Sequence, residues 1–349
     1  MSKLFVFNPE HDLALASNLA NFTAPHAGRQ LRTDLCYLPA LWAGPDDYVL
    51  VEHVEQARRL YGRLRARVGG GPGHFVDKSQ LSHIIINKVE PWGWDLALRS
   101  ALIRYGVSAD ACASEAEIAA VRSCSHRRHA AEVLRRLGWE KPFEATTVEA
   151  VEQRLSVSPR LVVKAPWSSS GRGVRFIDGL QIDYHRGWIR NVIQQQGSVM
   201  VEPFYPKVKD FGMELEALPD GHIHYLGLSL FDTHNGAYTG NIIASEEDKL
   251  EMINRYVSVD SLDSIREKVI SALRDVIGHQ YTGPFGVDMM IVAKSDGDGF
   301  LIHPCVEINL RRTMGHVAIE MAKASPTSLP RVMRITLTDK YRLHILRKR

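Results

Sequence analysis

The chain has 349 residues, of which 45% are hydrophobic and 24% are charged, and its formal net charge at pH 7 is +3. This length allows two or three domains with substantial cores, and the composition is that of an ordinary globular protein. The net charge is too small to indicate a nucleic-acid partner. No apolar stretch reaches the length of a membrane span, so no membrane partner is expected either.

The four cysteines lack the close spacing of a metal site and are too few for a disulfide scaffold. They are Cys36, Cys112, Cys124 and Cys305. Free thiols in a reducing cytoplasm are therefore the expectation. The N-terminus turns polar after a few apolar residues, which predicts a first strand and not a signal peptide.

The first part of the chain is predicted to be an α/β unit. Strands are expected over 4–7 and 48–51, and Val54 to Val68 has the apolar spacing of a helix. Further helices are expected over 96–105 and from Ser114 onward, and a domain boundary is expected near residues 110 to 125.

Two polar clusters follow the first predicted strand, and the second spans 21–30. The residues of interest are Asn8, Glu10, His11 and Arg29. Because ligands bind at the carboxyl ends of strands in open α/β sheets, these clusters are predicted to hold a second substrate. The alternative is that Asn8, Pro9 and Asp12 only cap a helix that begins near Leu13.

A strand ending in a lysine, Leu161 to Lys164, precedes a loop of small residues in the middle of the chain. The loop residues are Ser168, Ser169, Ser170, Gly171 and Gly173. Backbone N–H groups and hydroxyls of such a loop can surround phosphate oxygens, and Lys164 would add a positive charge. The loop joins two strands and lacks the GxxxxGK[ST] order, so it is not a P-loop. A solvated hairpin turn is the alternative.

The strand predicted over 198–204 stops at Glu202 and Pro203. Proline has no N–H, so backbone groups are left unpaired there. An adenine edge needs one backbone donor and one backbone acceptor, which such a strand end can offer; an ordinary β-turn is the alternative.

Downstream, the polar stretch 232–241 is predicted to be a binding loop.

The most informative pattern is a β-hairpin around the polar turn 294–299. Residues two apart on a strand face the same side, so Glu307, Asn309 and Arg311 project together. If Asp288 lies opposite Glu307, these oxygens suit Mg²⁺ carrying phosphates, and the guanidinium suits a phosphate or carboxylate oxygen. The hairpin therefore predicts nucleoside triphosphate chemistry.

With these motifs in this order, the chain resembles the ATP-grasp superfamily over residues 120 to 320. The lysine strand and its loop are similar to the family's phosphate-covering hairpin, the segment 201–204 to its adenine hinge, and the last hairpin to its metal-binding strands. The resemblance implies an α/β protein, α+β in its nucleotide domain, with an ATP-grasp fold behind a small N-terminal α/β domain. The implied segments are 1–115 for that domain, 116–197 and 198–335 for the two ATP-grasp lobes, and 336–349 for a C-terminal extension.

The resemblance also implies roles for individual residues. At the phosphates of ATP, the expected residues are Lys164, the serine and glycine loop, and Arg127 or its neighbour Arg128. At adenine they are Glu202 and Phe204, and at ribose Asp210 or Glu214. Those expected at Mg²⁺, with Mn²⁺ as an alternative, are Asp288, Glu307 and Asn309. Arg311 would stabilise the transferring phosphoryl group, and Tyr238 and Asn241 would lie beside the acceptor.

The implied activity is an ATP- and Mg²⁺-dependent ligase that joins a carboxylate to an amine or similar nucleophile through an acyl phosphate. The substrates would be small molecules or peptides, and the protein a cytoplasmic monomer or homodimer. Two alternatives use the same nucleotide site: an ATP-grasp kinase or phosphotransferase, and a non-catalytic ATP-binding regulatory protein. No G-x-S-x-G elbow occurs, so the serine run does not indicate a hydrolase.

Overall fold

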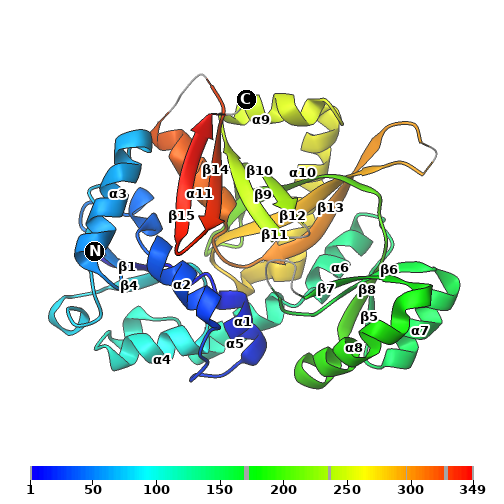
Figure 1. Cartoon of the computed structure of the whole chain (residues 1–349), viewed down its shortest axis with the longest axis horizontal. Helices are drawn as coiled ribbons and strands as arrows, with labels where there is room; N and C mark the ends of the chain where they lie inside the picture. Colours follow the sequence, from blue (N-terminus) through cyan, green and yellow to red (C-terminus); the bar gives the residue numbers. More distant parts are fainter. Residues whose placement is uncertain (1, 169–172, 235–236, 296, 326–328, 348–349) are drawn as a thin grey trace.

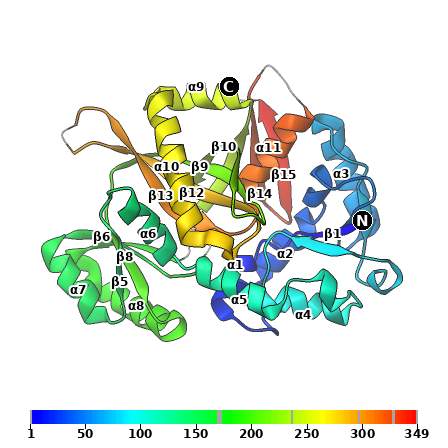
Figure 2. The ribbon, with the colours of Figure 1, turned by 180° about the vertical axis from the view of Figure 1, so that it is seen from behind.

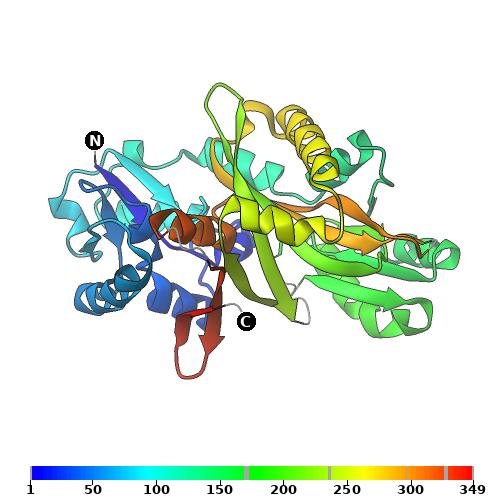
Figure 3. The same cartoon turned by 90° about the horizontal axis from the view of Figure 1, so that it is seen from above.

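The computed structural model describes residues 2–168, 173–234, 237–295, 297–325 and 329–347, and these residues form three sheets (Figure 1). A four-stranded parallel sheet lies at the N-terminal end of the molecule and a four-stranded antiparallel sheet at the opposite end, with a seven-stranded antiparallel sheet between them (Figure 3). Within this described part of the chain, no helix has both the length and the apolar character needed to cross a membrane.

The N-terminal sheet has the order β3-β2-β1-β4. Its strands are β1 (Lys3–Val6), β2 (Tyr48–Leu50), β3 (His74–Val76) and β4 (Lys88–Pro91), and its main helices are α1 (His11–Ser17), α2 (His26–Leu35), α3 (Val54–Val68) and α4 (Leu96–Arg104). Helix α3 has the predicted bounds because Ala57, Tyr61, Leu64 and Val68 recur at helical spacing and are all buried.

Helix α2 corrects the loop predicted over 21–30, since the helix begins at His26. The sequence alone does not reveal its partner, which is the C-terminal hairpin. The backbone N–H of Tyr341 donates to the buried Asp34 of α2 over 2.8 Å. A long-range contact therefore decides the conformation of this polar segment.

The central sheet has the order β13-β12-β9-β10-β11-β14-β15. Its strands are β9 (Lys207–Ala217), β10 (Ile223–His234), β11 (Ala237–Ile243), β12 (Gly283–Ala293), β13 (Phe300–Asn309), β14 (Arg331–Leu337) and β15 (Tyr341–Arg347). Part of the polar stretch predicted as a loop over 232–241 is strand instead: residues 232–234 and 237–241 form the paired ends of β10 and β11. Half of the predicted C-terminal extension, 336–349, is strand β15, which pairs with β14.

Helices cover both faces of the central sheet. On one face, α6 (Arg128–Arg136) and α10 (Val259–Ile277) pack on Met213, Leu215 and Val287 in the main hydrophobic core (Figure 2). On the other face, α11 (Met314–Ala324) packs over β9, β10 and β11. Because side chains alternate along a strand, Glu214 points to the α11 side while its neighbours enter the core.

The third sheet has the order β5-β8-β6-β7, and its own two helices pack on one of its faces. Its elements are β5 (Phe143–Ala145), α7 (Val148–Val157), β6 (Arg160–Lys164), β7 (Val174–Asp178), α8 (Ile182–Gln196) and β8 (Val199–Pro203). Val163 and Val201 pack into the core shared with α7 and α8. Strand alternation therefore turns Lys164 and Glu202 the other way, toward the central sheet.

Candidate active site

The predicted hairpin forms, and it brings the proposed metal ligands together. Strands β12 and β13 are antiparallel with Asp288 opposite Glu307 and Gly286 opposite Asn309. Glu214 on β9 pairs with Gly286 from the other side. Because residues two apart share a face, three carboxylates and one amide lie on a single face of the central sheet.

Burial makes this group of carboxylates unfavourable without a cation. Burial, followed by the charges of Glu307 and Glu214, raises the pKa of Asp288 to about 7. Among the described residues, no three His, Cys, Asp or Glu side chains are grouped to hold a metal ion by themselves. Mg²⁺ is usually held by one or two carboxylates together with substrate phosphates, so the pair Asp288 and Glu307 fits this metal.

Two cations predicted at the phosphates are already paired with carboxylates. The Arg127 guanidinium lies 2.8 Å from Glu307, and Lys164 forms a buried ion pair with Glu202. Arg128, the alternative to Arg127, instead pairs with Glu144 at the edge of a groove of about 700 Å³ beside β5. The geometry thus distinguishes the two arginines and places Arg127 at the carboxylates.

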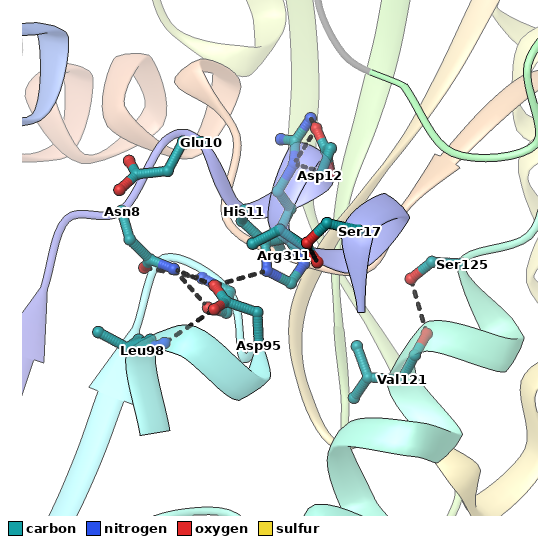
Figure 4. Close-up of polar contacts among 12 residues, drawn as sticks. Asn8, Glu10, His11, Asp12, Ser17, Asp95, Leu98, Val121, Ser125 and Arg311 are labelled. Atoms are coloured by element: carbon teal, nitrogen blue, oxygen red, sulfur yellow. Dashed lines mark hydrogen bonds and ion pairs between the residues drawn. The ribbon is translucent and has the colours of Figure 1, made fainter. Parts of the chain in front are cut away.

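The third cation, Arg311, is held by the N-terminal domain (Figure 4). Its Nε and Nη2 donate to the Asp12 carboxylate over 2.8 to 3.0 Å, and Nη2 also donates to Asn309 Oδ1 over 3.0 Å. Burial alone would lower the pKa of Arg311, but the ion pair with Asp12 raises it. Asn309 also hydrogen-bonds to Asp288, so it links the arginine to the carboxylates.

The ends of the predicted phosphate loop lie close together, between β6 and β7. A Cβ at Gly173 would come within 2.2 Å of the Ser168 side chain, so the loop needs glycine at this close approach. Ser168 accepts a hydrogen bond from Arg127 over 3.1 Å. Ser169, Ser170 and Gly171 lie outside the described residues.

The predicted adenine hinge, 201–204, lies at the end of β8. Glu202 is buried at the end of this strand, and Phe204 lies under the Arg160 guanidinium, 4.0 Å from the ring centroid. Next to the hinge lies an aromatic cluster that sequence reasoning missed: His303 stacks edge-on with Trp139 and Tyr205, 4.9 Å from each ring centroid. Its members are far apart in sequence, so no local pattern indicates the cluster.

The two candidates for the ribose contact have different surroundings. Asp210 is half-buried and accepts hydrogen bonds from Lys207 and Thr233, each over 2.7 Å. Glu214 is buried and lies 2.8 Å from the His316 Nδ1 atom of α11. The two carboxylates thus differ in access, and Asp210 is the more exposed.

Tyr238 and Asn241, predicted beside the acceptor, lie on β11 near Glu214. The Tyr238 hydroxyl donates to Asn241 Oδ1 over 2.5 Å, and the Asn241 amide donates to Ser229 over 2.8 Å. Burial and then the charge of Glu214 raise the pKa of Tyr238. These residues therefore form a hydrogen-bonded polar group beside the Glu214 carboxylate.

The N-terminal polar residues form contacts that helix capping does not explain. Helix α1 begins at His11, and its first turn has no side-chain cap. Asn8 donates to Gly93 O over 2.7 Å and to Asp95 over 3.1 Å, and the Asp12 carboxylate faces Arg311 (Figure 4). The interpretation of Asn8 and Asp12 as caps is therefore wrong.

The other N-terminal residues predicted to bind substrate differ in burial and in their partners: Glu10 and His11 are buried, and Arg29 is exposed. The buried Glu10 pairs with Arg32 over 2.5 Å, and burial raises its pKa despite this partner. His11 is buried, and its Nδ1 lies 3.8 Å from Asp95. Arg29 is exposed on α2. On this helix it is Arg32, one turn later, that reaches the polar cluster.

Sequence reasoning overlooked three residues of the site: Asp95, His316, and Asp12 as the partner of Arg311. Asp95 follows β4 as Asn8 follows β1, so the rule for the carboxyl ends of parallel strands would have found it. His316 occupies the third position of α11 and bonds the Thr313 backbone, a capping pattern visible in the sequence. Nothing local indicates the pairing of Asp12 with Arg311.

No family model matches the chain, and a search of curated protein sequences found no match. Solved structures do match. One is N5-carboxyaminoimidazole synthetase from Staphylococcus aureus in complex with ADP, with a TM-score of 0.52 and 12% identity over 96% of this chain and 82% of that chain.

Two more matches have similar scores. The biotin carboxylase domain of 2-oxoglutarate carboxylase from Hydrogenobacter thermophilus, in complex with MgADP, ADP and bicarbonate, has a TM-score of 0.53 and 11% identity over 96% of this chain and 74% of that chain. Phosphoribosylamine–glycine ligase from Thermotoga maritima has a TM-score of 0.52 and 12% identity over 98% of this chain and 82% of that chain. At such low identity, these matches establish the fold.

Proposed function

Because the chain has the ATP-grasp fold, we propose that it is an ATP- and Mg²⁺-dependent ligase that joins a carboxylate to an amine. The observation that carries the proposal is the pairing of Asp288 with Glu307, with the Lys164 charge close to His303 on the same strand as Glu307. Three proteins of this fold named above are an ADP-bound synthetase, an MgADP-bound carboxylase domain and a ligase. A non-catalytic ATP-binding protein would also need the metal ligands, but it would not need Arg311 held in one orientation by Asp12.

In the proposed reaction, a substrate carboxylate oxygen attacks the γ-phosphorus of ATP and the bond to the β,γ-bridging oxygen breaks, giving an acyl phosphate and ADP. The amine then attacks the acyl carbon, phosphate leaves and the amine loses a proton. Asp288 and Glu307, with Asn309, would hold Mg²⁺, which offsets charge on the phosphates when bound.

The remaining residues would bind and orient the substrates. Lys164 and Arg127 would neutralise phosphate oxygens, and Arg311, fixed by Asp12, would face the reacting carboxylate or acyl phosphate. The hinge at Glu202 would offer backbone groups to adenine. The organic substrates would lie toward the Asn8 and Tyr238 clusters, on either side of Arg311.

The test is whether ADP and inorganic phosphate form only when both an acid and an amine are supplied. Pools of amino acids, peptides and hydroxy acids would be screened with Mg²⁺ and ATP. Asp288→Asn should abolish the signal, whereas Asp183→Asn, at an 82% exposed side chain on α8, should not. A stable phosphorylated product formed without an amine would show a kinase instead.

A further inference from the structure

Arg127 is a buried connector between three parts of the nucleotide site. Its side chain is 7% exposed. The Nε atom donates to Ala165 O over 2.9 Å, and Nη2 lies 3.1 Å from Ser168 Oγ and 2.8 Å from Glu307 Oε1. One guanidinium therefore touches both the start of the phosphate loop and a carboxylate of β13.

Among the three cations of the site, Arg127 has the partner that matters for metal binding. Lys164 pairs with Glu202 and Arg311 with Asp12, and neither of these carboxylates is a proposed metal ligand. Glu307 is a proposed ligand and lies directly opposite Asp288. The Arg127 ion pair thus covers a carboxylate that a divalent cation would require.

A guanidinium and a divalent cation on the same carboxylate repel each other, and the repulsion is strong where water is excluded. The contact with Ser168 shows where the guanidinium can go. It already touches the loop proposed to surround phosphate oxygens, and arginine forms two parallel hydrogen bonds with a phosphate. A small displacement would exchange Glu307 for a phosphate.

We propose that Arg127 is a placeholder cation, which neutralises Glu307 in the absence of ligand and moves onto a nucleotide phosphate when the metal arrives. This inference rests on the proposed function. Its consequence is that the metal binds weakly alone and tightly with nucleotide. The apparent affinity for free metal is reduced by the fraction of molecules in which the ion pair is closed. Nucleotide removes this penalty, which is positive coupling between metal and nucleotide.

The experiment measures Mn²⁺ binding to the 349-residue chain by electron paramagnetic resonance, with and without ADP. Wild type should bind Mn²⁺ about tenfold more tightly with ADP than without it. Arg127→Ala should bind Mn²⁺ alone about tenfold more tightly than wild type, and its coupling to ADP should shrink correspondingly. Arg128→Ala is the matched control. That arginine is more than half exposed and pairs with Glu144, so its loss should change neither quantity.

Arg127→Gln keeps a hydrogen-bond donor for the Ala165 carbonyl oxygen and should bind Mn²⁺ as Arg127→Ala does. This variant replaces Arg127→Ala in the experiment if the alanine variant does not fold. Equal or weaker binding of free Mn²⁺ in either folded variant, while wild type binds Mn²⁺ with ADP, would overturn the placeholder role alone. Absence of Mn²⁺ binding in wild type even with ADP would overturn both this role and the metal site of the proposed function.

Discussion

Asp12 and Arg311 are 299 positions apart in the sequence and meet in a two-pronged ion pair. Asp12 comes from α1, the first helix of the chain, and Arg311 follows strand β13. Both side chains are largely buried, with 16% and 15% of their surface exposed. The N-terminal domain therefore fixes the orientation of the arginine expected to meet the reacting group.

Asp12→Asn should reduce kcat while leaving nucleotide affinity nearly unchanged. The neutral amide cannot hold both prongs of the guanidinium, and losing a charge-assisted pair costs about 1.5 to 3 kcal/mol, or roughly ten- to a hundredfold. Steady-state kinetics and ADP titration on the same preparation would measure the two effects. Asp110→Asn, at an exposed residue of the same domain, is the control and should match wild type. An unchanged kcat in Asp12→Asn would remove the orienting role.

Glu307→Gln and Asp288→Asn should abolish turnover while preserving the fold, because a neutral amide is a poor ligand for Mg²⁺. Circular dichroism would verify folding, and ADP release at saturating ATP and Mg²⁺ would report activity. Substantial turnover by either variant would contradict the metal assignment.

Asp288→Asn should also change the pH dependence of stability in the metal-free protein. The pKa of Asp288 rises from 3.8 to about 7 on folding. The folded state therefore retains a proton that the unfolded state has lost, and stability falls as pH rises from about 4 to 7. Asparagine removes this loss, so its melting temperature should exceed that of wild type by roughly 2–4 °C at pH 8. The two proteins should converge near pH 4, and a lower melting temperature at pH 8 would count against the account.

His303 should make the protein sensitive to acid. Burial and the nearby Lys164 lower its pKa from 6.5 to about 3. The unfolded state therefore binds a proton that the folded state refuses, and stability falls as pH drops below 6.5. Between pH 6.5 and 5 this loss amounts to about 1.5 kcal/mol. Denaturant unfolding of His303→Phe, whose ring can still pack on Trp139 and Tyr205, should show a correspondingly smaller loss. An identical pH slope in both proteins would contradict the buried neutral imidazole.

Gly315 should tolerate no side chain, because α11 lies against the sheet at this residue. A Cβ there would come within 1.9 Å of Glu214 Oε1 and 2.4 Å of Ser229 Oγ. Gly315→Ala should lower the free energy of unfolding by about 2 kcal/mol. Gly187→Ala on the exposed side of α8, where a Cβ meets nothing within 4 Å, should be neutral or slightly stabilising. Equal effects of the two changes would argue against the close docking of α11.

The spacing of apolar residues predicted those helices and strands whose conformation is determined by their own sequence. The hairpin around 294–299 and helix α3 follow from alternating and helical apolar spacing, and the opposition of Asp288 and Glu307 follows from the hairpin. Long-range contacts decided the rest. Residues 232–234 and 237–241 form strands because β10 pairs with β11 and β14 pairs with the far end of β11. The partners of Arg311 and His303 could not be predicted, since a charge or ring in the sequence does not reveal what the fold brings beside it.

Transfer of ¹⁸O from a carboxylate substrate to inorganic phosphate is the most direct test of the proposed ligase. A pool of amino acids and dicarboxylic acids labelled in the carboxyl group would be incubated with the protein, ATP, Mg²⁺ and an amine, and the phosphate analysed by ³¹P NMR. Through an acyl phosphate, the labelled oxygen attacks phosphorus and stays with it when the amine attacks carbon. The account predicts one ¹⁸O atom in each phosphate released. Phosphate released under the same conditions without the label would contradict it.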